Sequence, residues 1–288
     1  MKIAAVVVTF NRKEYLVKNI EALLAQVNAQ LDILIIDNAS TDGTKEAIQH
    51  YIDAGQIHYV NTGENLGGAG GFNFGIRRAY EAGYDAMWIM DDDTYPHPDA
   101  LEKFLQADKE LNGMYGYLAG KVLWKDGSWC EMNTPKYKGG MAEGKYKQIV
   151  QSSFVSMFVP RKSVATYGLP IKEFFIWGDD VEYTRRIALR EPSYLVEDSQ
   201  VLHDTKNNVG SNIVYDDERI DRYRYAYRNE MYIALHEGWK RRVYQQLKIW
   251  YHIAKIILKS SQKQRKIKLI LSASKEGKTF NPSIEYIQ

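Results

Sequence analysis

Trp88-Ile89-Met90-Asp91-Asp92-Asp93 is a short apolar run that ends in three consecutive carboxylates. Neighbouring acids repel one another, and burying them without a cation is costly. Carboxylate oxygens are the ligands that Mg²⁺ and Mn²⁺ prefer, so a divalent cation would explain the cluster. A helix N-terminus would explain Asp99 and one of the three acids, but not all three. The stretch therefore favours a metal or nucleotide site at the end of a buried strand.

Strands and helices alternate along the first third of the chain. Apolar, β-branched runs predict buried strands, and apolar residues at helical spacing predict helices. The expected strands are residues 3–10, 31–36, 57–60 and 86–90. The expected helices follow a cap at Asn11, the turn 39–43 and the glycine-rich stretch 65–75, which runs into a helix through Ala82. This order predicts an α/β fold with a mostly parallel, Rossmann-like sheet and helices on both faces.

The rest of the chain before residue 204 has a less regular pattern. The expected helices are residues 97–111, 161–167 and 181–189, and the expected strands are 117–124, 153–159 and 194–197. A turn at 126–128 predicts a hairpin that returns through 132. Residues 139–144 are expected to form a loop, and His203 is expected in a polar loop after the last strand.

The composition is that of an ordinary globular protein, with 45% hydrophobic and 26% charged residues among 288. Cys130 is the only cysteine, which excludes an intrachain disulfide and favours a reducing compartment. The apolar run at residues 3–8 is too short to span a membrane and lacks a signal-peptide cleavage site. We therefore expect a cytoplasmic protein.

Charge is distributed unevenly along the chain. The formal net charge is +2, but from Trp239 onward twelve lysines and arginines face only Glu276 and Glu285. That segment carries a formal charge of +10, and the preceding residues carry −8. We expect two parts, an α/β domain over residues 1–238 and a basic helical segment over 239–288.

The basic segment contains a helix-period pattern over residues 243–259. Its apolar positions are Val243, Leu247, Trp250, Ala254 and Ile257, and its polar positions are Lys248, His252, Lys255 and Lys259. Such a helix can lie on an anionic membrane surface, or it can pack on the domain with its basic side in solvent. The large positive charge favours a peripheral position at the inner face of the cell membrane. The interleaved apolar residues argue against nucleic acid as the partner.

Four polar clusters are expected to meet at one edge of the sheet, where parallel strands end. They are 9–12 with 37–43, 65–75 with Arg77 and Arg78, 177–182, and 203–204. An acid at the end of the second strand can accept hydrogen bonds from a ribose or a uracil, although such residues also form turns. Glycines allow a backbone to approach a ligand, although they also occur in flexible loops. Their spacing fits neither a dinucleotide fingerprint nor a P-loop.

The cluster at 177–182 combines an aromatic residue with acids at a helix start. A carboxylate placed there suits a general base, and Trp177 offers an apolar face for sugar C–H groups. The helix dipole alone would also account for Asp179 and Asp180. A histidine such as His203, together with remote aspartates, suits a Mn²⁺ site.

Taken in order, these motifs resemble family-2 glycosyltransferases of the GT-A fold. The matching stretches are Val8-Thr9-Phe10-Asn11-Arg12, Asp37-Asn38-x-Ser40-x-Asp42-Gly43, Asn65-x-Gly67-Gly68-x-Gly70-Gly71, Asp91-Asp92-Asp93, Asp179-Asp180-x-Glu182 and His203. Residues 65–72 and 177–182 are most similar to bacterial galactofuranosyltransferases. Rhamnosyltransferases of cell-surface polysaccharide assembly share much of the pattern.

The resemblance implies inverting, metal-dependent transfer of a sugar from a nucleotide sugar. It favours galactofuranose from UDP-galactofuranose, with a glycan or lipid-linked glycan of a bacterial cell surface as acceptor. The alternatives are a rhamnosyltransferase that uses dTDP-rhamnose and a nucleotide-sugar-binding protein without turnover.

The resemblance also implies roles for individual residues. Asp91, Asp93 and His203 resemble ligands of Mn²⁺ or Mg²⁺, and Asp180 resembles the catalytic base. Trp177 and Asp179 resemble acceptor-binding residues, although Gly178 departs from a galactofuranosyl pattern in which tryptophan directly precedes the acids. The residues expected around the nucleotide sugar are Thr9, Phe10, Asn11, Arg12, Asp37, Asn38, Asn65, Gly70, Gly71, Arg77 and Asp92.

Overall fold

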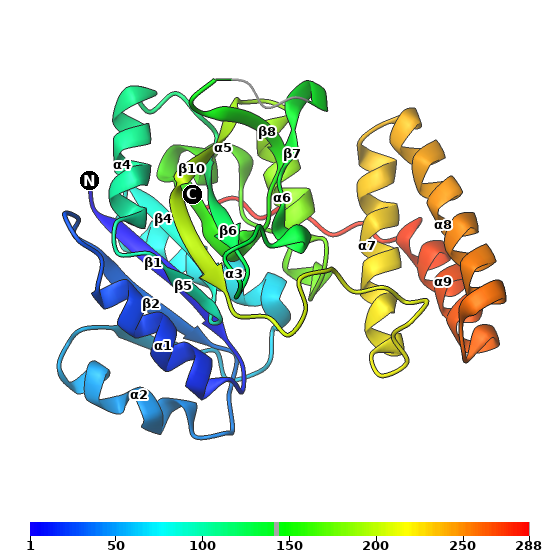
Figure 1. Ribbon diagram of the computed structural model, residues 1–288, viewed down its shortest axis with the longest axis horizontal. Helices are drawn as coiled ribbons and strands as arrows, with labels where there is room; N and C mark the ends of the chain where they lie inside the picture. Colours follow the sequence, from blue (N-terminus) through cyan, green and yellow to red (C-terminus); the bar gives the residue numbers. More distant parts are fainter. Residues whose placement is uncertain (141–143, 288) are drawn as a thin grey trace.

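The centre of the protein is a ten-stranded sheet in the computed structural model, which describes residues 1–140 and 144–287 (Figure 1). The strands run in the order β3-β2-β1-β4-β9-β6-β10-β8-β7, with β5 paired to β10. Their bounds are β1 (Ile3–Thr9), β2 (Asp32–Asp37), β3 (His58–Asn61), β4 (Ala86–Asp91), β5 (Thr94–Pro96), β6 (Leu118–Leu123), β7 (Lys136–Tyr137), β8 (Lys147–Gln151), β9 (Met157–Pro160) and β10 (Ser193–His203).

Helices cover both faces of this sheet, and three further helices lie apart from it. The bounds of the helices are α1 (Lys13–Leu24), α2 (Thr44–Asp53), α3 (Gly67–Glu81), α4 (Ala100–Glu110), α5 (Arg161–Tyr167), α6 (Asp179–Ala188), α7 (Tyr223–His236), α8 (Trp239–Lys259) and α9 (Lys263–Gly277). Successive side chains of β1 point to opposite faces, so Val7 packs with Leu16 of α1 and Val6 with Phe72 of α3. The predicted α/β arrangement with a mostly parallel central sheet is confirmed.

The four parallel strands β3, β2, β1 and β4 place the polar motifs together. The chain winds outward from β1 through β2 to β3, then returns to β4 on the other side of β1. Ligands of open α/β sheets bind at the carboxyl ends of strands beside such a reversal. The register aligns Thr9 of β1 with Asp37 of β2, and Val8 of β1 with Asp91 of β4. Strand β9 then pairs antiparallel with β4 and β6.

The glycine-rich stretch 65–75 is mostly helical, so the helix expected to follow it begins several residues earlier than predicted. Helix α3 begins at Gly67 and lies tightly against β1 and β2. A Cβ atom on Gly75 would lie 2.4 Å from Cγ1 of Val6, and one on Gly71 would lie 2.5 Å from Cγ1 of Val8. The missing side chains therefore serve close packing of the helix on the sheet.

Several other predicted boundaries were also wrong. Asn11 does not cap α1: it has a φ of 54°, and its Oδ1 accepts a hydrogen bond from the backbone of Thr41. His203 lies at the end of β10 and not in a loop, because β10 continues along β6 and pairs with β5. The hairpin expected through 132 is reduced to one bridge between Leu123 and Trp129. Part of the loop expected at 139–144 lies outside the described residues.

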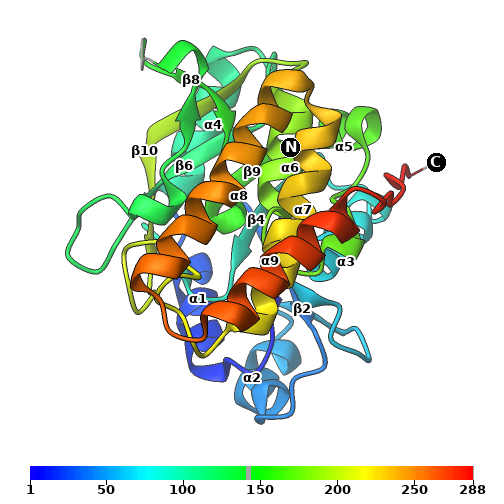
Figure 2. The same cartoon turned by 90° about the vertical axis from the view of Figure 1, so that its right-hand side faces the viewer.

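Helices α7, α8 and α9 form a separate layer at one end of the molecule (Figures 1 and 2). They share a core that includes Tyr227, Met231, Ile253 and Ile270. The helical layer begins with α7, at Tyr223. The domain boundary between residues 238 and 239, which was predicted from the charge distribution, stays a prediction. Among the described residues, no helix is both long and apolar enough to cross a membrane.

The chain after α9 returns to the α/β domain. Glu285 forms ion pairs with Arg77 of α3 at 2.9 Å and with Lys172 at 2.6 Å. The backbone oxygen of Glu285 also accepts a hydrogen bond from the amide of Leu169. The C-terminal residues thereby tie the helical layer back to the sheet domain.

Candidate active site

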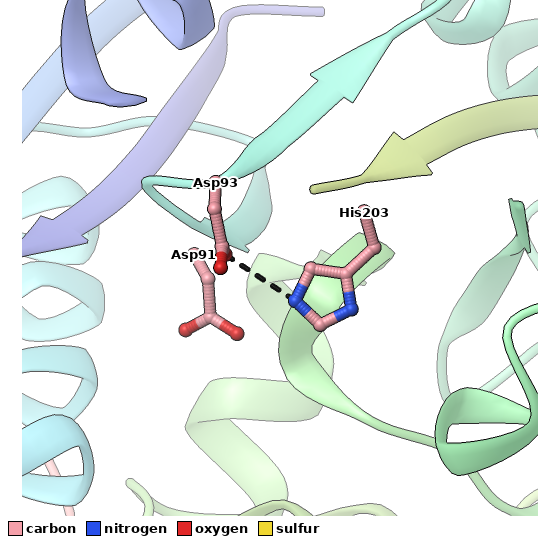
Figure 3. A group of neighbouring side chains, drawn as sticks. All are labelled: Asp91, Asp93 and His203. Atoms are coloured by element: carbon pink, nitrogen blue, oxygen red, sulfur yellow. Dashed lines mark ion pairs between the residues drawn. The ribbon is translucent and has the colours of Figure 1, made fainter. Parts of the chain in front are cut away.

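Asp91, Asp93 and His203 gather at the carboxyl end of β4 (Figure 3). Asp91 is the last residue of β4, Asp93 lies in the turn that follows, and His203 is the last residue of β10. Each offers one ligand atom, and these atoms lie within 4.8 Å of one another. Nε2 of His203 is 3.3 Å from Oδ1 of Asp93. The structure thus brings together the three residues expected to bind a metal.

The imidazole of His203 is oriented from behind by Asn133. Nδ2 of Asn133 donates a hydrogen bond to Oγ of Ser153, so its Oδ1 faces Nδ1 of His203 at 2.8 Å. Nδ1 therefore carries a proton, and Nε2 is the nitrogen turned toward Asp93. A hydrogen bond of this kind commonly fixes the ring of a histidine that binds a metal. Sequence reasoning missed Asn133, because its spacing from the other motifs carries no signal.

The chemistry of this group fits a divalent cation. Oδ1 of Asp93 is buried; it forms an ion pair with Nε2 of His203 but has no hydrogen-bond partner within the described part of the chain. Burial, with the charge of Asp93, raises the pKa of Asp91 to about 6. Burial alone would raise the pKa of Asp93 and lower that of His203. Their ion pair outweighs burial, so the pKa of Asp93 is lowered and that of His203 is raised to about 10. The group consists of two carboxylates and one imidazole, and the carboxylates attract a positive charge placed between them. These ligand types suit Mn²⁺ or Mg²⁺.

Asp92 is turned away from this group toward β1 and α1. Its Oδ2 accepts a hydrogen bond from Oγ1 of Thr9 at 2.7 Å. Arg12 lies 3.2 Å from Asp92 and 2.7 Å from Asp93. Burial raises the pKa of Asp92 to about 7, an effect that the charge of Arg12 opposes. Arg12 therefore supports the acids of the candidate metal site, and its expected contact with the nucleotide sugar stays a prediction.

Asp37 is held at the end of β2, beside Thr9. Its Oδ1 accepts a hydrogen bond from the amide of Ser40 at 2.8 Å, and its Oδ2 accepts one from the hydroxyl of Tyr59 at 2.7 Å. Burial, followed by this bond to Asp37, raises the pKa of Tyr59 to about 12. A carboxylate fixed in this way keeps lone pairs that can accept hydrogen bonds from a ribose. Phe10 lies near this edge and is exposed.

The other residues expected at the nucleotide sugar make structural contacts around α3. Nδ2 of Asn38 donates to the backbone oxygen of Gly67, and Oδ1 of Asn65 accepts from the amide of Gly67. Gly70 and Gly71 are buried in the packing of α3, and Arg77 is paired with Glu285. Their role as nucleotide contacts stays a prediction.

Asp179 and Asp180 begin helix α6. Gly178 precedes them with a φ of 91°, a conformation that only glycine adopts readily. Burial raises the pKa of Asp180 to about 6. The hydrogen bond from the backbone N–H of Val181 opposes this shift, and the charge of Asp91 adds to it. Burial and the charge of Asp180 raise the pKa of Asp179 well above its usual range. The charge of Asp91 adds to the raised pKa of both groups, which links the start of α6 electrostatically to the candidate metal site.

Asn229 of α7 holds the loop that leads into α6. Its side chain is fully buried, and its Nδ2 lies within hydrogen-bond distance of the backbone oxygens of Phe174, Ile176 and Trp177, at 3.0, 3.3 and 2.8 Å. The ring of Trp177 packs against Tyr223 of α7 at 5.0 Å between centroids. No motif marks Asn229, so sequence reasoning missed it.

Residues 4–158 match the family described as glycosyl transferase family 2. The chain belongs to this family. It is 26% identical over 256 residues to galactofuranosyltransferase GlfT1 of Mycobacterium tuberculosis. The alignment covers 81% of this chain and 82% of that relative. The protein is therefore a family-2 glycosyltransferase.

Solved structures show the same fold at low sequence identity. S. aureus TarS 1-349 in complex with UDP aligns with a TM-score of 0.60 at 15% identity, covering 97% of this chain and 72% of that one. In a longer TarS structure the match spans 44% of that chain. Mannosyltransferase PcManGT from Pyrobaculum calidifontis, in complex with GDP-Man and Mn²⁺, aligns with a TM-score of 0.56 at 16% identity. The alignment covers 94% of this chain and 73% of that chain. The fold is the GT-A fold.

Proposed function

We propose that the protein transfers galactofuranose from UDP-galactofuranose, with inversion, to a glycan or lipid-linked glycan of a bacterial cell surface. The observation that carries this proposal is the Asp91, Asp93 and His203 group at the carboxyl end of β4, whose ligand atoms lie within 4.8 Å of one another. The similarity to GlfT1 over most of both chains supports galactofuranose as the sugar. The single cysteine and the use of a nucleotide sugar support a cytoplasmic location.

The donor is bound by the ends of β1, β2 and β4. Asp91, Asp93 and His203 would hold Mn²⁺ or Mg²⁺, which when bound neutralises charge on the diphosphate and the leaving nucleotide. Arg12 and Thr9 keep Asp92 and Asp93 in place. Asp37 accepts hydrogen bonds from the nucleoside.

The acceptor reacts at the start of α6. Asp180 takes the proton of the acceptor hydroxyl while the hydroxyl oxygen forms a bond to the anomeric carbon. The bond from that carbon to the diphosphate oxygen breaks, and its electron pair leaves with UDP. Attack from the face opposite the leaving group inverts the anomeric centre. A pKa of about 6 leaves Asp180 ionised at neutral pH and still able to accept a proton.

Replacement of the proposed base tests this mechanism. Asp180→Asn should lower the rate of transfer by about a thousandfold, because general-base catalysis contributes factors of this size. Binding of UDP with Mn²⁺, measured by calorimetry, should stay within about twofold. Asp198→Asn, an exposed change on β10, is the matched control. An equal loss of UDP binding in Asp180→Asn would assign Asp180 to the nucleotide or metal site instead.

A panel of donors tests the sugar. Nucleotide release in the presence of Mn²⁺ should be fastest with UDP-galactofuranose, and slower with UDP-galactopyranose and dTDP-rhamnose. Turnover of dTDP-rhamnose alone would make the protein a rhamnosyltransferase. Binding of UDP without turnover of any donor would indicate a nucleotide-sugar-binding protein.

A further inference from the structure

Helix α8 has two apolar faces, and the protein uses only one of them internally. Ile249, Ile253 and Ile256 are buried against the other helices of the layer. The positions singled out from the sequence point the other way: Val243, Leu247, Trp250 and Ile257 are between 50% and 64% exposed. The alternative of a helix packed with only its basic side in solvent therefore does not describe α8.

The outer face of α8 carries unusually large apolar side chains. Trp239, Tyr244, Tyr251 and Leu258 add to the four residues above, with exposures from 54% to 76%. In Figure 2, α8 and α9 lie across the same end of the molecule, and α9 adds the exposed Leu271. Single exposed apolar residues are ordinary, but a continuous set on one helix marks a contact surface.

Lysines flank this apolar face. Nζ of Lys255 lies 4.5 Å from the ring centroid of Tyr251, and Nζ of Lys240 lies 5.8 Å from that of Trp239. Lys259 and Lys268 are also exposed. The two acids after Trp239 are neutralised elsewhere, Glu276 by Arg224 and Glu285 by Arg77 and Lys172. The surface is therefore apolar at its centre and cationic at its edges.

We propose that the outer face of α8 docks on a lipid bilayer that carries anionic headgroups. Tryptophan and tyrosine favour the membrane interface because their rings are amphipathic, and lysines are attracted to anionic lipid. A helix of this kind lies in the plane of the interface without crossing it. A second copy of the chain fits less well, because face-to-face docking would bring the flanking lysines of two copies together.

Docking would also orient the acceptor side of the active site, and this step rests on the proposed function. Helix α8 packs on α7, and α7 holds the loop 174–177 through Asn229. Helix α8 and Trp177 contribute to the same apolar cluster. A membrane-bound α8 therefore brings the acceptor loop close to the surface that carries a lipid-linked acceptor.

Vesicle flotation with the full chain tests the proposal. The wild-type protein should float with vesicles of phosphatidylcholine and phosphatidylglycerol at low salt, and float less with phosphatidylcholine alone. The double variant Leu247→Ser, Trp250→Ser should bind these vesicles about tenfold or more weakly, since both side chains would leave the acyl boundary. Leu189→Ser is the matched control, because Leu189 is 56% exposed at the end of α6 and should leave flotation unchanged.

A charge series separates the two parts of the attraction. Lys255→Gln and Lys259→Gln should each weaken binding to anionic vesicles about fivefold at low salt, and much less at high salt. Equal binding of wild type to neutral and anionic vesicles would overturn the requirement for anionic lipid. Quenching of tryptophan fluorescence by brominated lipid should occur in wild type and decrease in Trp250→Phe.

Other outcomes would overturn the proposal. Failure of wild type to float would do so, as would unchanged flotation of the Leu247→Ser, Trp250→Ser variant. A dimer that this variant abolishes, in a protein that does not float, would assign the face to a second copy. Binding of RNA that competes with vesicles and survives the variant would assign it to nucleic acid. Asp180→Asn should float like wild type, so failure of the docking and failure of the proposed chemistry are distinguishable.

Discussion

The proposed donor side and the proposed acceptor side of the active site are built differently. On the donor side, Thr9, Asp37 and Asp91 lie at the ends of adjacent parallel strands, and the register of β1 fixes their relative positions. On the acceptor side, Trp177 and Asp180 follow a loop with left-handed residues that depends on Asn229 of α7. The donor side is set by local strand patterns, and the acceptor side by a contact between distant segments.

This difference has a consequence for how the two sides respond to mutation. Strand ends within a sheet are supported by many backbone hydrogen bonds, so a single side chain there can be lost without moving its neighbours. The proposed acceptor loop depends on the side-chain amide of Asn229, and losing that amide removes a donor from the backbone oxygens of Ile176 and Trp177 and one of the donors to Phe174. Donor-side changes should therefore alter chemistry with little effect on structure, and acceptor-side changes should alter both.

The largest effect is expected at the metal site. Asp91→Asn or Asp93→Asn should lower transfer by a thousandfold or more, because each removes a charged ligand of the cation that neutralises the leaving diphosphate. The melting temperature of Asp91→Asn should change little, since burial and the charge of Asp93 disfavour the ionised form of Asp91 when no cation is bound. Mn²⁺ titrations of activity and thermal melts measure both effects. A large loss of stability without added metal would contradict the view that donor-side residues serve chemistry alone.

An intermediate effect is expected at the support of the acceptor loop. Asn229→Ala leaves three backbone oxygens without this partner, so unfolding free energy should fall by about 1–3 kcal/mol. The KM for the acceptor should rise about tenfold or more, while the Kd for UDP stays near wild type. Asn208→Ala, a change of another loop asparagine, is the control. An equal change in UDP binding would remove the distinction between the two sides.

The smallest effect on activity is expected in α3, the helix that packs behind the proposed donor side, where a substitution should change stability alone. Gly75→Ala places a methyl group 2.4 Å from Cγ1 of Val6 and should lower the free energy of unfolding by about 1–3 kcal/mol. Gly68→Ala lies in the same helix with nothing within 4 Å and should leave stability equal or slightly higher. Chemical denaturation measures both. Equal effects would show that the glycines do not serve the packing of α3.

Much of the donor side could be predicted because its signals are short in sequence. An apolar run that ends in Asp91, Asp92 and Asp93 predicts both a buried strand and a cation-binding group within six residues. The role of Asp92 was less accessible, since its partners Thr9 and Arg12 lie about eighty residues earlier, at the end of β1 and just before α1. The glycines of α3 were misinterpreted because the reason for them lies on other strands. A side chain at Gly71 or Gly75 would collide with Val6, Val8 or Ile36 of β1 and β2.

The sequence by itself determined the alternation of strands and helices, the acids at the strand ends and the two-sided character of α8, because hydrophobic period and residue chemistry are local properties. The tertiary structure alone decided that Asn133 orients His203, that Asn229 holds the acceptor loop, and which apolar face of α8 is buried. Each of these depends on which surfaces far apart in the chain come into contact. That choice follows from shape and burial summed over the whole molecule, and no short stretch of sequence contains it.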